Sequence, residues 1–213
     1  MDILNVDYIA IDRNDSNHFL SLGAELYNKG KYLEAIEYYE LAAAMGNSHA
    51  ISNLGYCYLY GRGIPKDEKK ALLYFNIAAN KNDIDALYKI GTFYLSGKYV
   101  TKDKDIAMYF LNKAFEEAIE NYGDLTQFPS LCLTLAKEYM EDDEKDPLLI
   151  YKLLTDAKVG YEYEIGENGA SYYTESYNKV LEMLDNPMFE EIEHSCDCDG
   201  DCGCGDCDCD HDE

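Results

Sequence analysis

The residues of this chain best suited to chemistry are the cysteines near its C-terminal end. Six of the eight cysteines fall within fourteen residues, where they form three Cys-x-Cys pairs on a glycine-containing backbone. Two histidines flank them, and the set of candidate metal ligands is His194, Cys196, Cys198, Cys202, Cys204, Cys207, Cys209 and His211. Thiolates and imidazoles are good ligands for Zn²⁺, and thiolates also suit Cu(I). The segment therefore predicts a site that could take either ion.

The same segment is strongly acidic, and this leaves a second interpretation open. The chain has 18 basic and 42 acidic residues and a net charge of −24, and 13 of the acidic residues follow Lys179, the last basic one. Carboxylates between the cysteines raise thiol pKa values by repulsion, yet they also attract cations. The alternative is a disordered acidic tail in which a Cys-Asp unit has expanded without binding metal.

Composition disfavours several classes of partner and location. Nucleic-acid binding needs clustered Lys and Arg, and an anionic membrane surface would repel so acidic a chain. No apolar run approaches the roughly 20 residues of a membrane span. The first residues lack the basic start and apolar stretch of a secretion signal, so we expect a cytoplasmic protein with reduced thiols.

Catalytic signatures are missing as well. The chain has no phosphate-binding glycine loop, dinucleotide fingerprint, nucleophile elbow or His-Glu-x-x-His helix. We therefore expect a protein that is not an enzyme and requires no cofactor. Outside the tail, Cys57 and Cys132 fall on expected helices and are predicted to be buried. His18 and His49 are expected to be surface or packing residues.

The body of the chain is repetitive. Two segments, beginning at His49 and Asp85, align at a spacing of 36 residues. The matched pairs are Ala50/Ala86, Gly55/Gly91, Leu59/Leu95, Gly61/Gly97, Lys66/Lys102, Asp67/Asp103, Ala71/Ala107, Phe75/Leu111 and Ala78/Ala114. A shorter unit precedes them over residues 18–48, with a turn four residues shorter, and a degenerate unit follows over 131–160. Such self-similarity predicts stacked helix pairs, because one unit cannot bury its own apolar stripe.

Glycines and aspartates mark how each pair is built. Gly23, Gly55 and Gly91, with Ala136 in the last unit, occupy one register in the middle of the first helices. Glycine costs about 1 kcal/mol there relative to alanine, so its recurrence predicts a close approach of the two helices. Other glycines and acidic residues are expected to end first helices or cap second ones: Gly30, Gly61, Gly63 and Gly97 in turns, and Asp67, Asp103 and Asp146 as N-caps, the last followed by Pro147.

These residues resemble a known repeat family. The pattern is Ala50, Leu54, Gly55, Tyr58, Gly61, Gly63, Ile64, Asp67, Ala71, Tyr74 and Ala78, followed by Ala86, Ile90, Gly91, Tyr94, Gly97, Val100, Asp103, Ala107, Phe110 and Ala114. It is similar to the Sel-one-like repeat, an α/α relative of the tetratricopeptide repeat. Residues 18–48 look more like an ordinary tetratricopeptide repeat, and residues 131–160 depart from the pattern. The resemblance implies a right-handed α/α solenoid that binds proteins and performs no catalysis.

The predicted fold is therefore all-α and has three parts. Residues 1–15 form an N-terminal extension, and residues 16–185 form a solenoid of about four helix pairs, closed by a capping helix over 168–185. Residues 186–213 form a disordered tail rich in cysteine, aspartate and glycine.

The resemblance to this family implies that the first helix of each pair lines the concave face of the solenoid. Removing the positions of the apolar stripe leaves the candidate partner-binding residues Asn53, Tyr56, Tyr60, Lys89, Thr92, Phe93, Lys137 and Glu138. Aromatic side chains with polar tips are common at protein interfaces, although such rings can also simply pack between repeats. The function expected is a scaffold or adaptor for another protein or peptide, and the alternative is a metal-handling protein that uses the tail.

Overall fold

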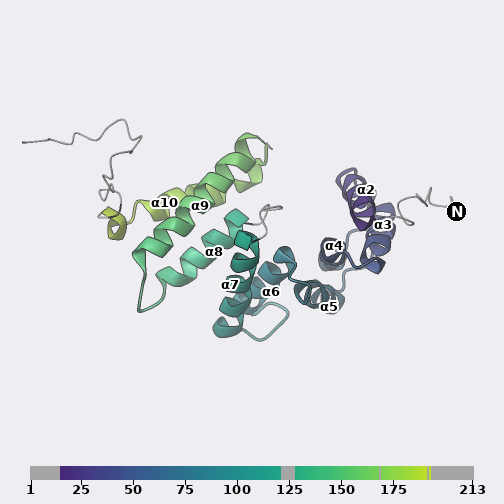
Figure 1. Cartoon of the computed structure of the whole chain (residues 1–213), viewed down its shortest axis with the longest axis horizontal. Coiled ribbons are helices and arrows are strands. Elements are labelled where there is room, and N and C mark those ends of the chain that lie inside the picture. Colours follow the sequence, from purple (N-terminus) through teal and green to yellow (C-terminus); the bar gives the residue numbers. More distant parts are fainter. Residues whose placement is uncertain (1–14, 121–127, 168, 191, 193–213) are drawn as a thin grey trace, which may run out of the picture. The chain divides into compact units, whose positions relative to one another are not determined.

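The computed structural model describes residues 15–120, 128–167, 169–190 and 192, and over these ranges every regular element is a helix (Figure 1). The predicted all-α fold is thereby confirmed. The chain divides into two compact units, residues 1–135 and 136–213, which are described separately. The expected extension falls almost wholly outside the described residues, and the candidate metal ligands fall entirely outside them.

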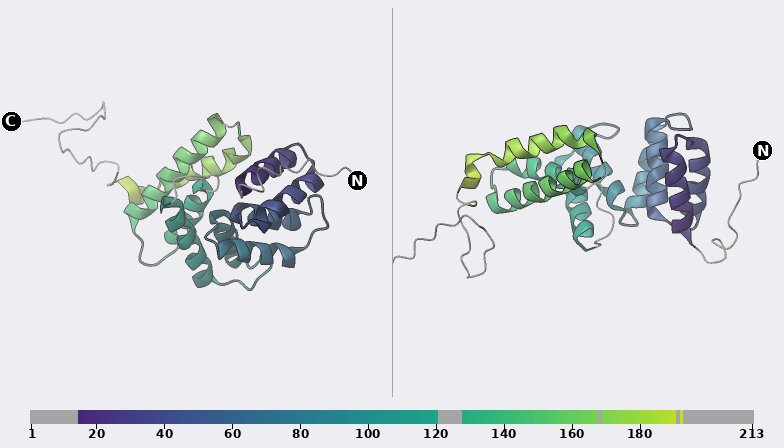
Figure 2. Two further views of the ribbon diagram at one scale, coloured as in Figure 1. Left: turned by 45° about the vertical axis from the view of Figure 1, so that its right-hand side comes forward. Right: turned by 90° about the horizontal axis from the view of Figure 1, so that it is seen from above.

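Six helices and part of a seventh form the first unit. Their bounds are α2 (Ser16–Asn28), α3 (Tyr32–Ala44), α4 (Ser48–Tyr60), α5 (Glu68–Ala79), α6 (Ile84–Ser96), α7 (Lys104–Glu120) and the first part of α8 (Phe128–Met140). The most extensive packing joins α2 to α3, α4 to α5 and α6 to α7, and smaller contacts join α3 to α4 and α5 to α6 (Figure 2). This is the predicted arrangement of stacked helix pairs.

Mid-helix glycines allow the two helices of each pair to pack closely. A Cβ atom at Gly55 would lie 3.0 Å from the ring of Phe75, and one at Gly91 would lie 2.7 Å from Cγ of Leu111. These two contacts are equivalent across the 36-residue spacing. A Cβ atom at Gly23 would lie 2.6 Å from the Tyr39 ring, four residues nearer in sequence because the turn is shorter. The predicted close approach of the helices is confirmed.

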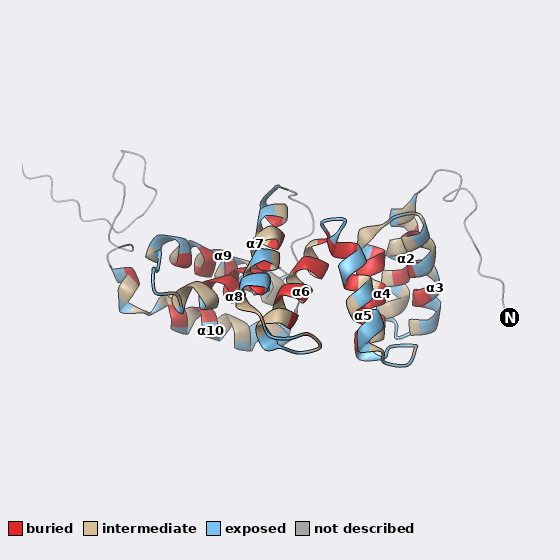
Figure 3. Cartoon of the chain, turned by 90° about the horizontal axis from the view of Figure 1, so that it is seen from below, coloured by how far each residue is buried: buried red, intermediate tan, exposed pale blue. Residues whose placement is uncertain are grey.

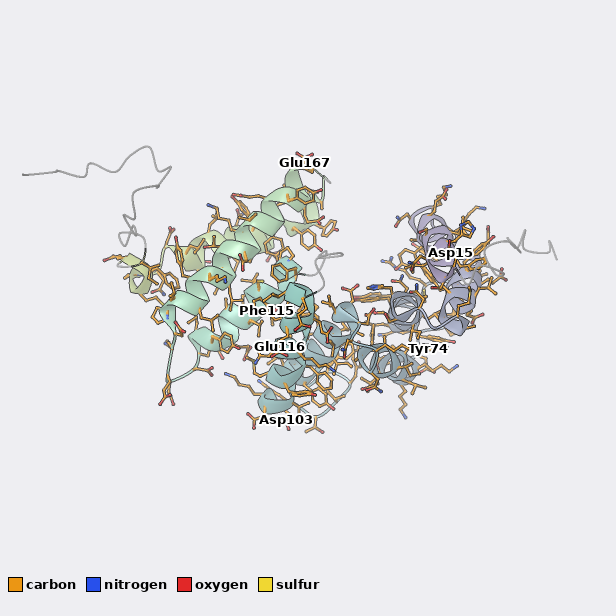
Figure 4. All side chains as sticks on the ribbon, viewed as in Figure 1. Asp15, Tyr74, Asp103, Phe115, Glu116 and Glu167 are labelled. Carbon is orange, nitrogen blue, oxygen red and sulfur yellow. The ribbon has the colours of Figure 1, made fainter. Side chains whose placement is uncertain are left out.

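The helix ends also follow the expected chemistry. Gly61 and Gly97 end α4 and α6 in the left-handed region, with φ values of 68° and 67°. Each carboxylate of Asp67, Asp103 and Asp146 accepts a hydrogen bond from the main-chain N–H three residues on, at 3.0 to 3.1 Å. Figure 4 places Asp103 at the start of α7. All three predicted N-caps are therefore confirmed.

The second unit contains the rest of α8, then α9 (Pro147–Gly166), η1 (Ser171–Tyr173), α10 (Thr174–Leu184) and η2 (Pro187–Phe189). Buried residues recur along α9 and α10 and alternate with exposed ones (Figure 3). The expected closing helix begins later than residue 168, since a short 3-10 turn precedes α10. Phe189 is only 1% exposed, and its ring lies 5.5 Å from that of Tyr151. The folded body thus extends beyond residue 185, because Phe189 packs against α9.

Candidate partner-binding site

A pocket of about 370 Å³ lies in the first unit, between the C-terminal ends of α4 and α6. Both helices and the turn that follows each of them contribute to it. Its lining residues are Leu59, Tyr60, Lys66, Lys89, Thr92, Phe93, Ser96, Lys98 and Tyr99. Four of these, Tyr60, Lys89, Thr92 and Phe93, are among the partner-binding candidates expected from the sequence, and the fold brings them together.

The repeat spacing explains how these side chains come to face one pocket. Ser96 is the 36-residue equivalent of Tyr60, and both residues line the pocket. Equivalent positions on successive first helices lie on the same face of a stacked array. The two turns after α4 and α6 therefore also lie near each other, and they add Lys66 and Lys98 to the pocket.

Lys89 is the most unusual of the lining residues, because its ammonium lies over two tyrosine rings and is partly buried. The ammonium lies 5.3 Å from the ring centre of Tyr56 and 5.8 Å from that of Tyr88. Burial lowers the pKa of Lys89, and the nearby Asp85 carboxylate acts in the opposite direction. Over the described residues, no carboxylate lies within 4.0 Å of this ammonium. The cation is therefore partly withdrawn from water without a paired anion, which is costly.

Tyr56 lies beneath that ammonium and carries a second unsatisfied group. Its ring stacks on Tyr60 at 6.1 Å and meets Phe75 edge-on at 5.1 Å. Its hydroxyl is buried and makes no hydrogen bond within the part of the chain that the structure describes. Burial raises the pKa of Tyr56 well above its ordinary value, so the hydroxyl stays protonated and remains a donor. Buried polar groups without partners are uncommon, so this hydroxyl is an exception among the buried groups of the described residues.

The remaining candidates in the first unit differ in exposure. Tyr60 is 55% exposed, so its ring is open to a partner. Phe93, in contrast, is only 6% exposed, because its ring packs edge-on against Phe75 and Tyr99. It forms a wall of the pocket and is not the exposed contact that we expected. The Thr92 hydroxyl already donates to the Lys89 carbonyl at 2.8 Å. Asn53 is half-buried on α4 and does not line the pocket.

Two candidates belong to the second unit and form no part of this pocket. Lys137 is exposed and lines a separate hollow of about 430 Å³ beside α10, together with Lys179 and Glu182. Burial and the positive charge of Lys179 lower the pKa of Lys137. Glu138 is half-buried next to it on α8. This hollow is shared with α10, a contact that the repeat pattern alone did not predict.

The described residues offer no obvious alternative chemistry. They contain no group of three or more His, Cys, Asp or Glu side chains placed to hold a metal ion. Both Cys57 and Cys132 are buried, as predicted, and burial raises the pKa of the Cys57 thiol to about 11. Within the same ranges, no helix is long and apolar enough to cross a membrane.

The sequence did not predict a contact between α4 and the residue that caps α6. The buried carboxylate of Asp83 accepts a hydrogen bond from the Ala86 N–H at the start of α6. Its other oxygen lies 3.0 Å from Nδ1 of His49 on α4. His49 is therefore a packing residue that links successive repeats. The sequence could have predicted the N-cap at Asp83, because its equivalent 36 residues earlier, Asn47, caps α4 in the same way, but it held no signal for the contact with His49.

Comparison with known proteins agrees with this architecture. Residues 48–83 and 84–118 each match the Sel1 repeat, and residues 20–48 match a tetratricopeptide repeat. "DAP3-binding cell death enhancer 1" of Rattus norvegicus is 44% identical over 55 residues, which is 26% of this chain. The Mus musculus protein of the same name is 43% identical over 54 residues, or 25% of this chain. In each case the match spans only 11% of the relative's length.

Two solved structures are also similar. One is c5321, a protective antigen of uropathogenic Escherichia coli with an SLR fold, at a TM-score of 0.56 and 20% identity, covering 82% of this chain and 39% of that one. The other is a Sel1 repeat protein from Oxalobacter formigenes, at a TM-score of 0.46 and 29% identity, covering 52% and 86%. The first likeness concerns the fold alone. Together with the helix pairs described above, the repeat matches identify residues 48–118 as two Sel1 repeats and residues 20–48 as a tetratricopeptide repeat.

Proposed function

We propose that this protein is a non-enzymatic scaffold that binds another protein through the pocket between α4 and α6. The observation that carries the proposal is the pocket itself, which combines the exposed ring of Tyr60 with the unpaired ammonium of Lys89. Aromatic rings and partly desolvated polar groups are typical of the centres of protein interfaces. Sel1 and tetratricopeptide repeats typically mediate protein interactions, and the rat relative is named for binding DAP3.

Site-specific photo-cross-linking tests this proposal. A photoreactive phenylalanine analogue would replace Tyr60 in the full chain, and in a matched control it would replace Tyr109, which is 63% exposed on α7. We expect a defined covalent adduct in cells from position 60 and none from position 109. Equal yields at the two positions, or none at position 60, would contradict a partner site in this pocket.

A second role, metal binding by the acidic tail, rests on the sequence. Six cysteines and two histidines within residues 194–211 supply eight ligands, enough for two tetrahedral zinc sites or one thiolate cluster. This role assumes a reducing compartment, such as the cytoplasm, in which the thiols stay free. It can coexist with the scaffold role, because the two use different parts of the chain.

Metal titration of the reduced full chain tests the second role. Zn²⁺ or Cu(I) should bind stoichiometrically and release protons, since the thiols must ionise to bind. The control is the full chain with all six tail cysteines replaced by serine, which retains Cys57 and Cys132. Equal uptake by the two proteins would exclude the tail as the metal site.

A further inference from the structure

The pocket between α4 and α6 concentrates positive charge on a strongly acidic protein. Three of its nine lining residues are lysines, whereas the whole chain has only 18 basic residues and a net charge of −24. Lys66 is paired with Glu68 at 2.8 Å. Lys89 and Lys98 contact tyrosine rings, the Lys98 ammonium lying 5.2 Å from the ring of Tyr99. Over the described ranges, neither of these two ammoniums has a carboxylate within 4.0 Å.

Such a pocket favours an anion from outside the chain. A half-buried ammonium has lost part of its hydration, and the rings beneath it replace only part of what water supplied. A carboxylate from a partner would form a charge-assisted hydrogen bond with Lys89 in this drier environment.

The walls of the pocket indicate what else the ligand carries. Leu59 and Phe93 give it an apolar lining, and the exposed ring of Tyr60 stands at its side. A volume of about 370 Å³ exceeds what one carboxylate fills, and it suits a short stretch of peptide. The ligand therefore combines negative charge with apolar side chains.

We propose that the pocket binds an acidic internal segment of a partner protein, in which a Glu or Asp side chain pairs with Lys89 and a neighbouring apolar side chain packs against Tyr60 and Phe93. This inference rests on the proposed scaffold function and specifies its partner. It is argued from charge complementarity between the lysines of the pocket and the carboxylates of the ligand.

Peptide binding to the reduced full chain tests the inference. The probe is a fluorescein-labelled peptide, Gly-Ser-Leu-Glu-Tyr-Glu-Leu-Gly-Ser, and the matched peptides carry Gln or Lys in place of both Glu residues. The protein variants are Lys89→Met, Lys89→Arg and Tyr60→Ala. The control is Lys69→Met, which makes the same change of charge at an exposed lysine on α5.

We expect the Glu peptide to bind about tenfold more tightly than the Gln peptide, and the Lys peptide to bind worst. Lys89→Met should weaken the Glu peptide about tenfold and leave the Gln peptide unchanged, whereas Lys89→Arg should retain binding and Lys69→Met should change it less than twofold. Raising the ionic strength from about 0.05 to about 0.5 M should weaken only the Glu peptide. Unchanged binding of the Gln peptide by Lys89→Met excludes misfolding of that variant as the cause of its loss.

Three outcomes would overturn the inference. If the Glu and Gln peptides bind equally and Tyr60→Ala weakens both, the pocket is an interaction site without preference for acids, and the scaffold function stands. If no peptide binds and position 60 also yields no cross-link in cells, the scaffold function fails with it. If an unlabelled peptide of residues 193–213 displaces the Glu peptide at lower concentration than the unlabelled Glu peptide does, the occupant is the chain's own acidic segment.

Discussion

The most direct test of how the repeats are built is the substitution Gly91→Ala. The added Cβ atom would lie 2.7 Å from Cγ and 2.8 Å from Cδ2 of Leu111, and 3.2 Å from the carbonyl oxygen of Ala107. Carbon atoms in good contact are about 3.5–4.0 Å apart, so the leucine must move by nearly 1 Å, and the carbonyl can move only with α7. Overpacking of this kind costs about 1–3 kcal/mol, and alanine regains about 1 kcal/mol of helix propensity. We expect a net loss of up to about 2 kcal/mol in the free energy of unfolding.

Urea unfolding of the reduced full chain, followed by far-ultraviolet circular dichroism, measures this loss. The control is Gly166→Ala near the end of α9, where a Cβ atom would meet nothing within 4 Å, so stability should rise by up to about 1 kcal/mol. A double-mutant cycle with Leu111→Ala gives the sharper result. The new methyl group occupies part of the cavity left by the leucine, so the double variant should lose about 1–2 kcal/mol less than the two single losses combined. Additive losses, or a gain in stability for Gly91→Ala, would refute the packing argument.

Three further predictions concern the turns, the caps and a buried thiol. The Arg62 guanidinium lies 5.2–5.6 Å from three tyrosine rings and donates a hydrogen bond to the Tyr27 hydroxyl at 2.6 Å. Replacing Arg62 by leucine should therefore lower the protein's stability by about 1 kcal/mol in thermal melts, while the control Lys69→Leu should change it little. In the same melts, Asp67→Ala should lower the protein's stability by about 1 kcal/mol, and Asp67→Asn should lower it much less, because asparagine can still cap α5. Equal losses of stability in the two variants would contradict a capping role. Burial raises the pKa of Cys57 from an ordinary value of 9.0 to about 11, so the native state holds its proton longer than the unfolded state does. The stability that this thiol contributes is complete below about pH 9 and falls by about 2–3 kcal/mol by pH 11, and a Cys57→Ala variant should lack that part of the alkaline decline.

Most of the helix architecture could be predicted because its causes are local. Mid-helix glycines, turn glycines and capping aspartates act on their own helix or on the one next in sequence, so a spacing of 36 residues carries the information from one unit to the next. The same logic could have corrected the placement of Phe93. Its equivalent 36 residues earlier is Cys57, which we expected to be buried, and both are buried in the structure.

The candidate site was predicted only in part. Tyr60 and Lys89 were identified as belonging to one face, but Lys66 and Lys98 were overlooked because they follow the helices in turns. The turns after α4 and α6 are 36 residues apart in sequence. They lie beside the same pocket because of the angle at which one repeat is rotated against the next. That rotation results from side-chain packing along the whole interface, which no single residue specifies.

The sequence by itself determined the class of fold, the repeated helix pairs with several of their turns and caps, and the concentration of acid and cysteine at one end of the chain. These follow from composition and from interactions between near neighbours. Only the tertiary structure decided that Lys89 rests over the rings of Tyr56 and Tyr88 while no described carboxylate pairs with it. The charge state and hydration of a side chain depend on everything packed around it, and that environment exists only once the repeats have stacked.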